Sequence, residues 1–86
     1  MGDLVLAIDI GNSTTDIGLF DREGTLRFRS ALATSRNASG DQCAMNLMGV
    51  FSLYQADIRA VSGAILSSVV PSVTANMCAA VERLSG

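Results

Sequence analysis

The strongest constraint on the fold is an apolar run near the N-terminus that stops abruptly at a polar turn containing glycine. Residues 4–8 are LVLAI, and residues 9–13 are DIGNS. A short continuous aliphatic run is typical of a strand in the middle of a sheet, buried on both faces. The turn predicts that the chain then reverses into a second strand from Thr14 to Phe20, with Thr15, Ile17 and Leu19 on one face.

A second turn and a third strand follow. Residues 21–24 place Asp first and Gly last, which favours a type I turn and a hairpin. The next residues alternate between an apolar and a polar face. We expect one face to carry Leu26, Phe28 and Leu32, and the other to carry Thr25, Arg27 and Arg29. Two arginines on the polar face suit an exposed edge of the sheet.

The rest of the chain predicts a helix, a fourth strand and a second helix. A capping box is expected at the first helix, with Ser39 as N-cap and the Gln42 side chain bonding back to it. The apolar stripe expected on this helix is Ala44, Leu47, Met48 and Phe51. The fourth strand is expected at residues 60–69, and Pro71 suits the first turn of the last helix. The stripe expected there is Val73, Met77, Ala80, Val81 and Leu84.

The element order is therefore βββαβα, an α/β architecture. A strand that returns through a helix can pair parallel to the first strand by a right-handed crossover. The first strand would then lie between the second strand and the fourth. With 86 residues, the chain is shorter than a typical domain. At this length a stable core is possible but thin.

Composition excludes several classes of protein. The chain is 49% apolar and 16% charged with a net charge of −2, and no basic run occurs. Nucleic acid and anionic membrane surfaces are therefore poor candidates for partners. No membrane-spanning run and no secretory signal are visible, so we expect a cytoplasmic protein. Cys43 and Cys78 are expected to be reduced, buried thiols and not a disulfide or a metal site.

The sequence contains neither histidine nor lysine. Without histidine, Ser-His and Cys-His nucleophile pairs are excluded. Without lysine, the lysine-dependent P-loop is excluded as well. Any chemistry must use carboxylates, hydroxyls, backbone amides and arginine.

The segment from Asp9 to Thr14 is the best candidate for such chemistry. Gly11 allows the backbone to approach an anion, and consecutive N–H groups can form a concave anion site. Asp9 offers a carboxylate suited to hydrated Mg²⁺ beside phosphates. Phosphoryl transfer depends mainly on such positioning and charge neutralisation. A plain hairpin fits the same residues equally well, because Gly-Asn pairs are common in tight turns.

Three motifs in order resemble a known family. The opening LAIDIGNSTTDIGLFD looks like that of the acetate and sugar kinase, heat-shock chaperone and actin superfamily. Its Asp-Ile-Gly-Asn-Ser form closely resembles type III pantothenate kinases. Thr34-Ser35-Arg36, with Ser39 and Asp41, is similar to that family's segment before its first helix. Residues 65–71, ILSSVVP, look like its strand ending in Ser-Ser-Val-Val-Pro.

The resemblance implies a ribonuclease H-like, actin-like ATPase domain, of which residues 1–86 are the N-terminal part with the first phosphate loop and without the second domain. It implies an ATP-binding loop whose metal side is Asp9. The loop residues are Asp9, Ile10, Gly11, Asn12, Ser13, Thr14, Thr15 and Asp16. Thr14 stands where the family usually has Asn, and Asp16 where an apolar residue is common. Asp16 adds negative charge near phosphates, or is simply a solvent-facing carboxylate. For Ser67, Ser68 and Pro71 we expect a structural role first.

The implied activity is transfer of the ATP γ-phosphate to pantothenate in coenzyme A biosynthesis, by a homodimer that uses Mg²⁺ or another divalent metal and a monovalent cation such as K⁺ or NH₄⁺. The segment that carries the catalytic base in the family has no counterpart here, so we assign no catalytic residue and expect this chain alone to be inactive. Two alternatives stay open. One is a non-catalytic regulatory relative that binds nucleotide, and the other is a different kinase of the same superfamily.

Overall fold

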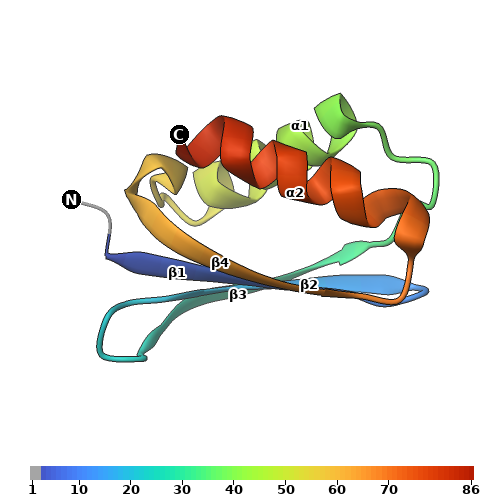
Figure 1. The fold of residues 1–86 in the computed structure, drawn as a ribbon. Helices are drawn as coiled ribbons and strands as arrows, with labels where there is room; N and C mark the ends of the chain where they lie inside the picture. The colour runs from blue at the N-terminus through green and yellow to red at the C-terminus, as the bar shows by residue number, and fades with distance from the viewer. Residues whose placement is uncertain (1–2) are drawn as a thin grey trace.

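The computed structural model describes residues 3–86 and has the predicted element order, βββαβα (Figure 1). The α/β fold class is therefore confirmed. The elements are β1 (Leu4–Ile10), β2 (Thr14–Phe20), β3 (Leu26–Ala33), α1 (Gly40–Leu53), a short 3-10 helix η1 (Ile58–Ala60), β4 (Val61–Ser68) and α2 (Pro71–Ser85). No helix within this range is long and apolar enough to cross a membrane.

The four strands form one mixed sheet in the order β3-β2-β1-β4. β1 pairs antiparallel with β2 and parallel with β4, so the central position of β1 is confirmed. Within residues 3–86, β3 pairs with β2 alone and forms one edge, as its two arginines predicted. The parallel pairing follows from the return of the chain through α1, which carries it back to the starting end of β1.

Both helices lie on the same face of the sheet (Figure 1). In β1 every second side chain points toward them, so Leu6, Ile8 and Ile10 are buried. On the opposite face Ala7 is only half-buried and Asp9 is exposed. The prediction that both faces of β1 are buried is therefore wrong for residues 3–86. An apolar run alone cannot distinguish a strand covered on one face from a strand covered on both.

The core lies between the sheet and the helices. Its most deeply buried side chains come from every layer: Leu6, Ile10, Ile17, Leu19, Leu47, Val70 and Cys43. The Phe28 ring of β3 packs edge-on against Phe51 of α1, with a centroid separation of 5.3 Å. The same ring stacks on Tyr54 at 4.7 Å. These aromatic contacts fix the end of α1 against the edge strand.

The alternation predicted for β3 fails at its start. The pairing with β2 shifts between Leu19 and Phe20, so that Leu19 lies opposite Phe28 while Phe20 lies opposite Leu26. The extra residue is a β-bulge, and it moves Leu26 to the face that no helix covers, where its exposed fraction is 48%. Phe28 stays in the core as predicted.

Helix α1 is rotated from its predicted stripe. Ser39 is the N-cap, and its Oγ accepts the Gln42 N–H at 3.1 Å, as expected. The Gln42 side chain instead donates to Asn46 Oδ1, so the second half of the capping box is absent. Met48 is 55% exposed, whereas Cys43 is buried. The buried set is Cys43, Ala44, Leu47, Val50 and Phe51.

Helix α2 begins at Pro71 as predicted, and its apolar stripe faces the core. Of the five residues expected in that stripe, Val73, Met77, Ala80 and Val81 are buried and Leu84 is half-buried. Cys78 lies outside the stripe and is exposed, which corrects the expectation that both cysteines are buried. Its position one residue after Met77 turns it toward solvent.

Candidate phosphate-binding site

The candidate loop is the tight connection between β1 and β2. It is closed by a hydrogen bond from the Gly11 N–H to the Thr14 carbonyl at 2.9 Å. A Cβ atom at Gly11 would lie 3.1 Å from that same carbonyl oxygen, closer than side chains usually approach. Glycine is therefore favoured here, because a side chain would require the Thr14 carbonyl to shift. Because the Gly11 N–H is used inside the turn, the amides left for an anion are those of Asn12 and Ser13.

Two other segments meet this loop. The carbonyl of Ile10 accepts the Val69 N–H at 3.0 Å, and the carbonyl of Ser13 accepts the Thr34 N–H at 2.9 Å. The hydroxyls of Thr15 and Thr34 lie 2.8 Å apart. The three motifs singled out in the sequence, far apart along the chain, therefore adjoin one another at the carboxyl end of β1 and β4. In open α/β sheets this end is where ligands usually bind.

The segment after β3 is fixed from both sides. Arg36 Nη2 donates to Asn12 Oδ1 at the tip of the loop, at 2.6 Å. From α2, Ser72 Oγ donates to the Arg36 carbonyl at 2.9 Å, and Asn76 Nδ2 donates to the Ala38 carbonyl at 3.0 Å. Ser72 thus connects α2 to the loop through Arg36, and Asn76 fixes the same segment at Ala38. Sequence reasoning missed both, although two polar residues four apart beside an apolar stripe are a usable signal.

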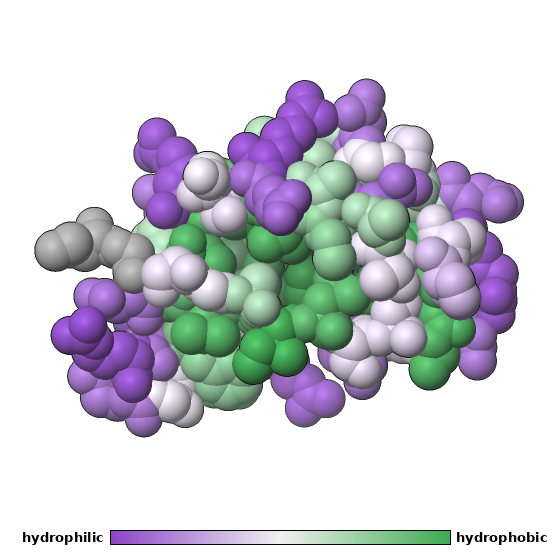
Figure 2. Space-filling view, viewed as in Figure 1, coloured by the Kyte–Doolittle hydropathy of each residue, from purple (hydrophilic) through white to green (hydrophobic). Residues whose placement is uncertain are grey.

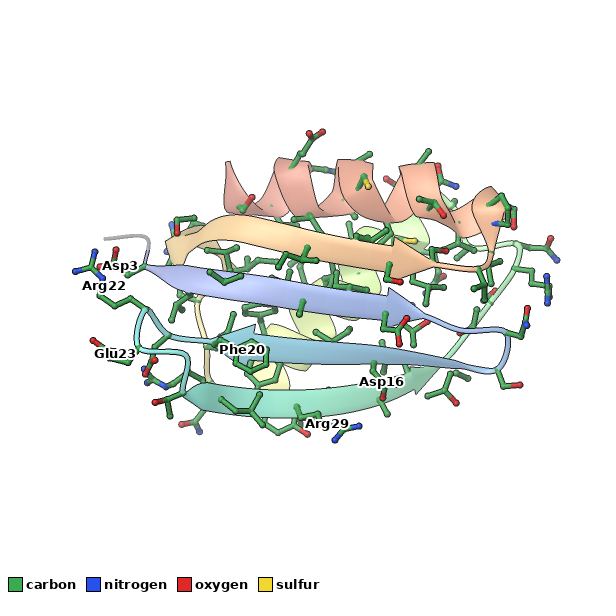
Figure 3. The ribbon with its side chains drawn as sticks, turned by 60° about the horizontal axis from the view of Figure 1, so that its bottom comes forward. Asp3, Asp16, Phe20, Arg22, Glu23 and Arg29 are labelled. Atoms are coloured by element: carbon green, nitrogen blue, oxygen red, sulfur yellow. The ribbon has the colours of Figure 1, made fainter. Side chains whose placement is uncertain are left out.

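Two carboxylates and a hydroxyl lie side by side on the uncovered face of the sheet. Asp9 on β1 is opposite Asp16 on β2 and beside Ser67 on β4. Figure 3 looks onto this face and shows Asp16 and Arg29 on neighbouring strands. Within residues 3–86, neither aspartate takes part in an ion pair. The face therefore carries two carboxylates that form no direct ion pair, next to the loop.

A shallow hollow of about 380 Å³ runs along the same face. Its polar lining is Asp9, Asp16, Arg29 and Ser67, and its apolar part includes Phe20, Leu26 and Ile65. Asp9 lines this hollow, whereas Gly11 and Ser13 do not. Arg29, expected only to mark an exposed edge, lies in the hollow because the strand pairing sets it opposite Gly18.

The eight predicted loop residues differ in what they offer. Ile10 and Thr15 are buried on the helix side, so only their backbone atoms are available to a ligand. Asn12, Ser13 and Thr14 are exposed at the tip, as is Asp9 on the uncovered face. Asp16 is half-buried. The structure thus provides amides and hydroxyls at the tip and carboxylates beside it.

The fold and the loop together define a class. A βββαβα sheet with both helices on one face, and a polar hairpin joining its first two strands, is the N-terminal arrangement of an actin-like ATPase domain. The sequence profile described as "Type III pantothenate kinase" matches residues 5–86. The chain belongs to the type III pantothenate kinase family.

Several curated relatives bear that family name. The chain is 42% identical over 79 residues to the type III pantothenate kinase of Deinococcus radiodurans, covering 92% of this chain and 29% of that relative. It is 38% identical over 84 residues to the protein of the same name from Thermus thermophilus, covering 96% and 32%. For Desulfotalea psychrophila the identity is 35% over 83 residues, covering 96% and 31%. The chain thus spans about a third of the length of these relatives.

Proposed function

We propose that this chain supplies the first phosphate-binding loop of a protein that transfers the γ-phosphate of ATP to pantothenate, the opening step of coenzyme A biosynthesis. The observation that carries the proposal is the junction of three family motifs at one end of the sheet, through the Val69–Ile10 and Thr34–Ser13 hydrogen bonds. These two bonds extend the β1–β4 and β2–β3 strand pairings by one residue each, so that the loop is held on both sides. A loop held on both sides can present its amides in a fixed arrangement, which favours anion binding.

In this proposal the tip binds the phosphates of ATP. The N–H groups of Asn12 and Ser13 take part in no hydrogen bond found within residues 3–86. The exposed hydroxyls of Ser13 and Thr14 add further donors. Because these groups are neutral, they contribute mainly orientation, and the charge of the phosphates requires cations.

Asp9 is the residue proposed to hold a divalent metal. Within the described residues, no cluster of three or more His, Cys, Asp or Glu side chains could hold an ion. Mg²⁺ does not require such a cluster, since it is usually held by one or two carboxylates together with waters and substrate phosphates. The exposed, unpaired carboxylate of Asp9 fits that donor set. When bound, the metal would neutralise charge on the phosphates.

The remaining parts of the activity are assigned to residues outside this chain. These are the catalytic base, the pantothenate and adenosine pockets, the second phosphate loop and the second domain. We further propose a cytoplasmic homodimer that requires K⁺ or NH₄⁺. Phosphoryl transfer needs nucleophile, metal and phosphate held in line, and these 86 residues form one wall of such a site. We therefore expect the chain alone to have no kinase activity.

Isothermal titration tests the proposal. Mg·ATP is expected to bind the chain, and binding is expected to weaken when Mg²⁺ is omitted or Asp9 is changed to Asn. Asp3→Asn is the matched control, because Asp3 is an exposed aspartate at the other end of β1 (Figure 3). The absence of any Mg²⁺-dependent binding would contradict the proposal. Undiminished affinity in Asp9→Asn would contradict only the role assigned to that carboxylate.

Kinase activity is tested separately by a coupled assay of ADP release with pantothenate, Mg²⁺ and K⁺. No pantothenate-dependent turnover is expected from the purified chain. Turnover abolished by Asp9→Asn would show that the chain is a complete enzyme. Mg·ATP binding without turnover would also be the behaviour of the regulatory alternative, so the same assay on a longer relative of this chain separates the two.

A further inference from the structure

The arginines of this chain divide into two groups. The sequence has six basic residues, all of them arginine. Four form ion pairs with aspartates: Arg22–Asp3, Arg27–Asp21, Arg59–Asp57 and Arg83–Asp41. The other two, Arg29 and Arg36, form none with the described residues: Arg36 contacts the loop, and Arg29 lies in the hollow beside Asp9 and Asp16. Of the two, Arg36 is therefore the cation available where a phosphate is expected.

Arg36 is the cation in direct contact with the loop. Its guanidinium donates to Asn12 Oδ1 at 2.6 Å, so the amide oxygen of Asn12 is already occupied. The two Nδ2–H donors of Asn12 make no hydrogen bond found within residues 3–86. Because Arg36 binds the Oδ1 atom of Asn12, the Nδ2–H groups point away from Arg36. Amide N–H groups of this kind can donate to a phosphate oxygen.

The position of Arg36 is itself fixed. Ser72 Oγ holds its carbonyl at 2.9 Å, and the neighbouring Thr34 N–H bonds the Ser13 carbonyl at 2.9 Å. The backbone of residue 36 is thus held between α2 and the loop, although its side chain is exposed. Because the backbone of Arg36 is already held, less conformational entropy is lost when its side chain makes the contact with Asn12.

We propose that Arg36 is a positioning residue of the phosphate loop, which orients Asn12 and adds a positive charge for the polyphosphate of a nucleoside triphosphate. The inference rests on the proposed nucleotide-binding function and names the residue that adapts the loop to a highly charged ligand. Asp9 and Asp16 make the surroundings negative, and the chain contains no lysine. A fixed guanidinium reduces the repulsion that an incoming polyphosphate meets.

The test compares the chain with Arg36→Gln, Arg36→Lys and Arg22→Gln by titration with Mg·ATP and with inorganic tripolyphosphate. Arg22→Gln is the matched control, since Arg22 is also exposed and bonded to one side-chain oxygen, in the turn at the opposite end of the sheet (Figure 3). Arg36→Gln is expected to weaken both ligands by about tenfold, the order contributed by a hydrogen bond to a charged group. Arg36→Lys is expected to recover part of the loss, and Arg22→Gln to match the unchanged chain.

A double-variant cycle separates positioning from charge alone. If Arg36 acts through Asn12, the combined change Asn12→Ala and Arg36→Gln weakens tripolyphosphate binding by less than the product of the two single effects. Multiplicative effects would overturn the positioning role. Unchanged binding by Arg36→Gln in a chain that binds Mg·ATP would overturn the inference alone. A chain that binds neither ligand would overturn the proposed function as well. Loss of the ligand-free melting transition in Arg36→Gln would show a structural role instead.

Discussion

Asp9 and Asp16 lie directly opposite each other on β1 and β2, with both side chains on the face of the sheet that no helix covers. Two like charges in this cross-strand position destabilise the pairing. Within residues 3–86 neither is compensated by an ion pair. A cation bound next to the two carboxylates would reduce their repulsion.

The first prediction is that Asp16→Asn stabilises the ligand-free chain. Removing one of the two opposed charges is expected to raise the free energy of unfolding by about 0.2–1 kcal/mol. Urea denaturation followed by circular dichroism measures this change. Glu23→Gln is the control, because Glu23 is exposed in the far turn and its loss changes the net charge equally. Equal effects of the two variants would show that net charge, and not the opposed pair, is responsible.

The second prediction concerns Gly11. Gly11→Val would place a branched side chain where even a Cβ atom lies 3.1 Å from the Thr14 carbonyl, so the turn must open. We expect a loss of about 1–3 kcal/mol of stability, and a larger loss of Mg·ATP affinity than Asp16→Val causes. Gly63→Val is the control for stability, since no neighbouring atom lies within 4 Å of a Cβ there. Equal losses of affinity in Gly11→Val and Asp16→Val would favour a plain hairpin.

The third prediction concerns the two thiols. Cys78 is exposed and should react with a disulfide reagent in the folded chain, whereas Cys43 is 1% exposed and should react only on unfolding. Burial raises the pKa of the Cys43 thiol. The neutral thiol is thus favoured in the folded state, so its contribution to stability is present below the pKa of an unfolded thiol, about 8.5. That contribution is lost as the pH rises toward the higher folded value.

The pH dependence is checked by urea denaturation at neutral and alkaline pH. Cys43→Ala should reduce the alkaline loss of stability, and Cys78→Ala should leave it unchanged. Rapid labelling of both thiols in the folded chain would contradict the burial on which this prediction depends.

The fourth prediction is self-association through the outer edge of β4. Within residues 3–86, β4 pairs only with β1; Ile65 on it and Val69 directly after it are 67% and 63% exposed. Figure 2 shows apolar surface gathered on the side where β4 forms this edge. An apolar strand edge is a template for pairing with another chain. Ile65→Lys should lower the average molar mass measured by analytical ultracentrifugation at high protein concentration, without lowering the melting temperature. Met45→Lys, at a similarly exposed helix position, should not.

The order of the strands was predictable because local signals agreed with the fold. An apolar run, two turns and a Pro-initiated helix each place one element, and the crossover rule places β4 beside β1. Burial on individual faces was harder to predict. A β-bulge places Leu26 on the exposed face of the sheet. The rotation of α1 buries Cys43 and exposes Met48. Both depend on packing between elements, which residue spacing does not report.

The candidate loop was found from its residue types, but its connections were not. That Asp9 and Asp16 share a face follows from their strand pairing, which the hairpin fixes. The Arg36–Asn12 contact joins two turns whose relative position is set by α2. Nothing in the spacing of these residues predicts it, because turns have no regular period from which a contact can be inferred.

The central position of β1 has a consequence for how the chain folds. Of the four strands, β1 comes first in the sequence and its parallel neighbour β4 comes fourth. The β1–β2–β3 meander contains only local pairings, so it can form early. The other edge of β1 is covered only when β4 pairs with it, beginning with Val61 opposite Leu4. We therefore expect closure of the β1–β4 pair to limit the folding rate, and unfolding to begin by separation of the β4–α2 unit from a meander that persists longest.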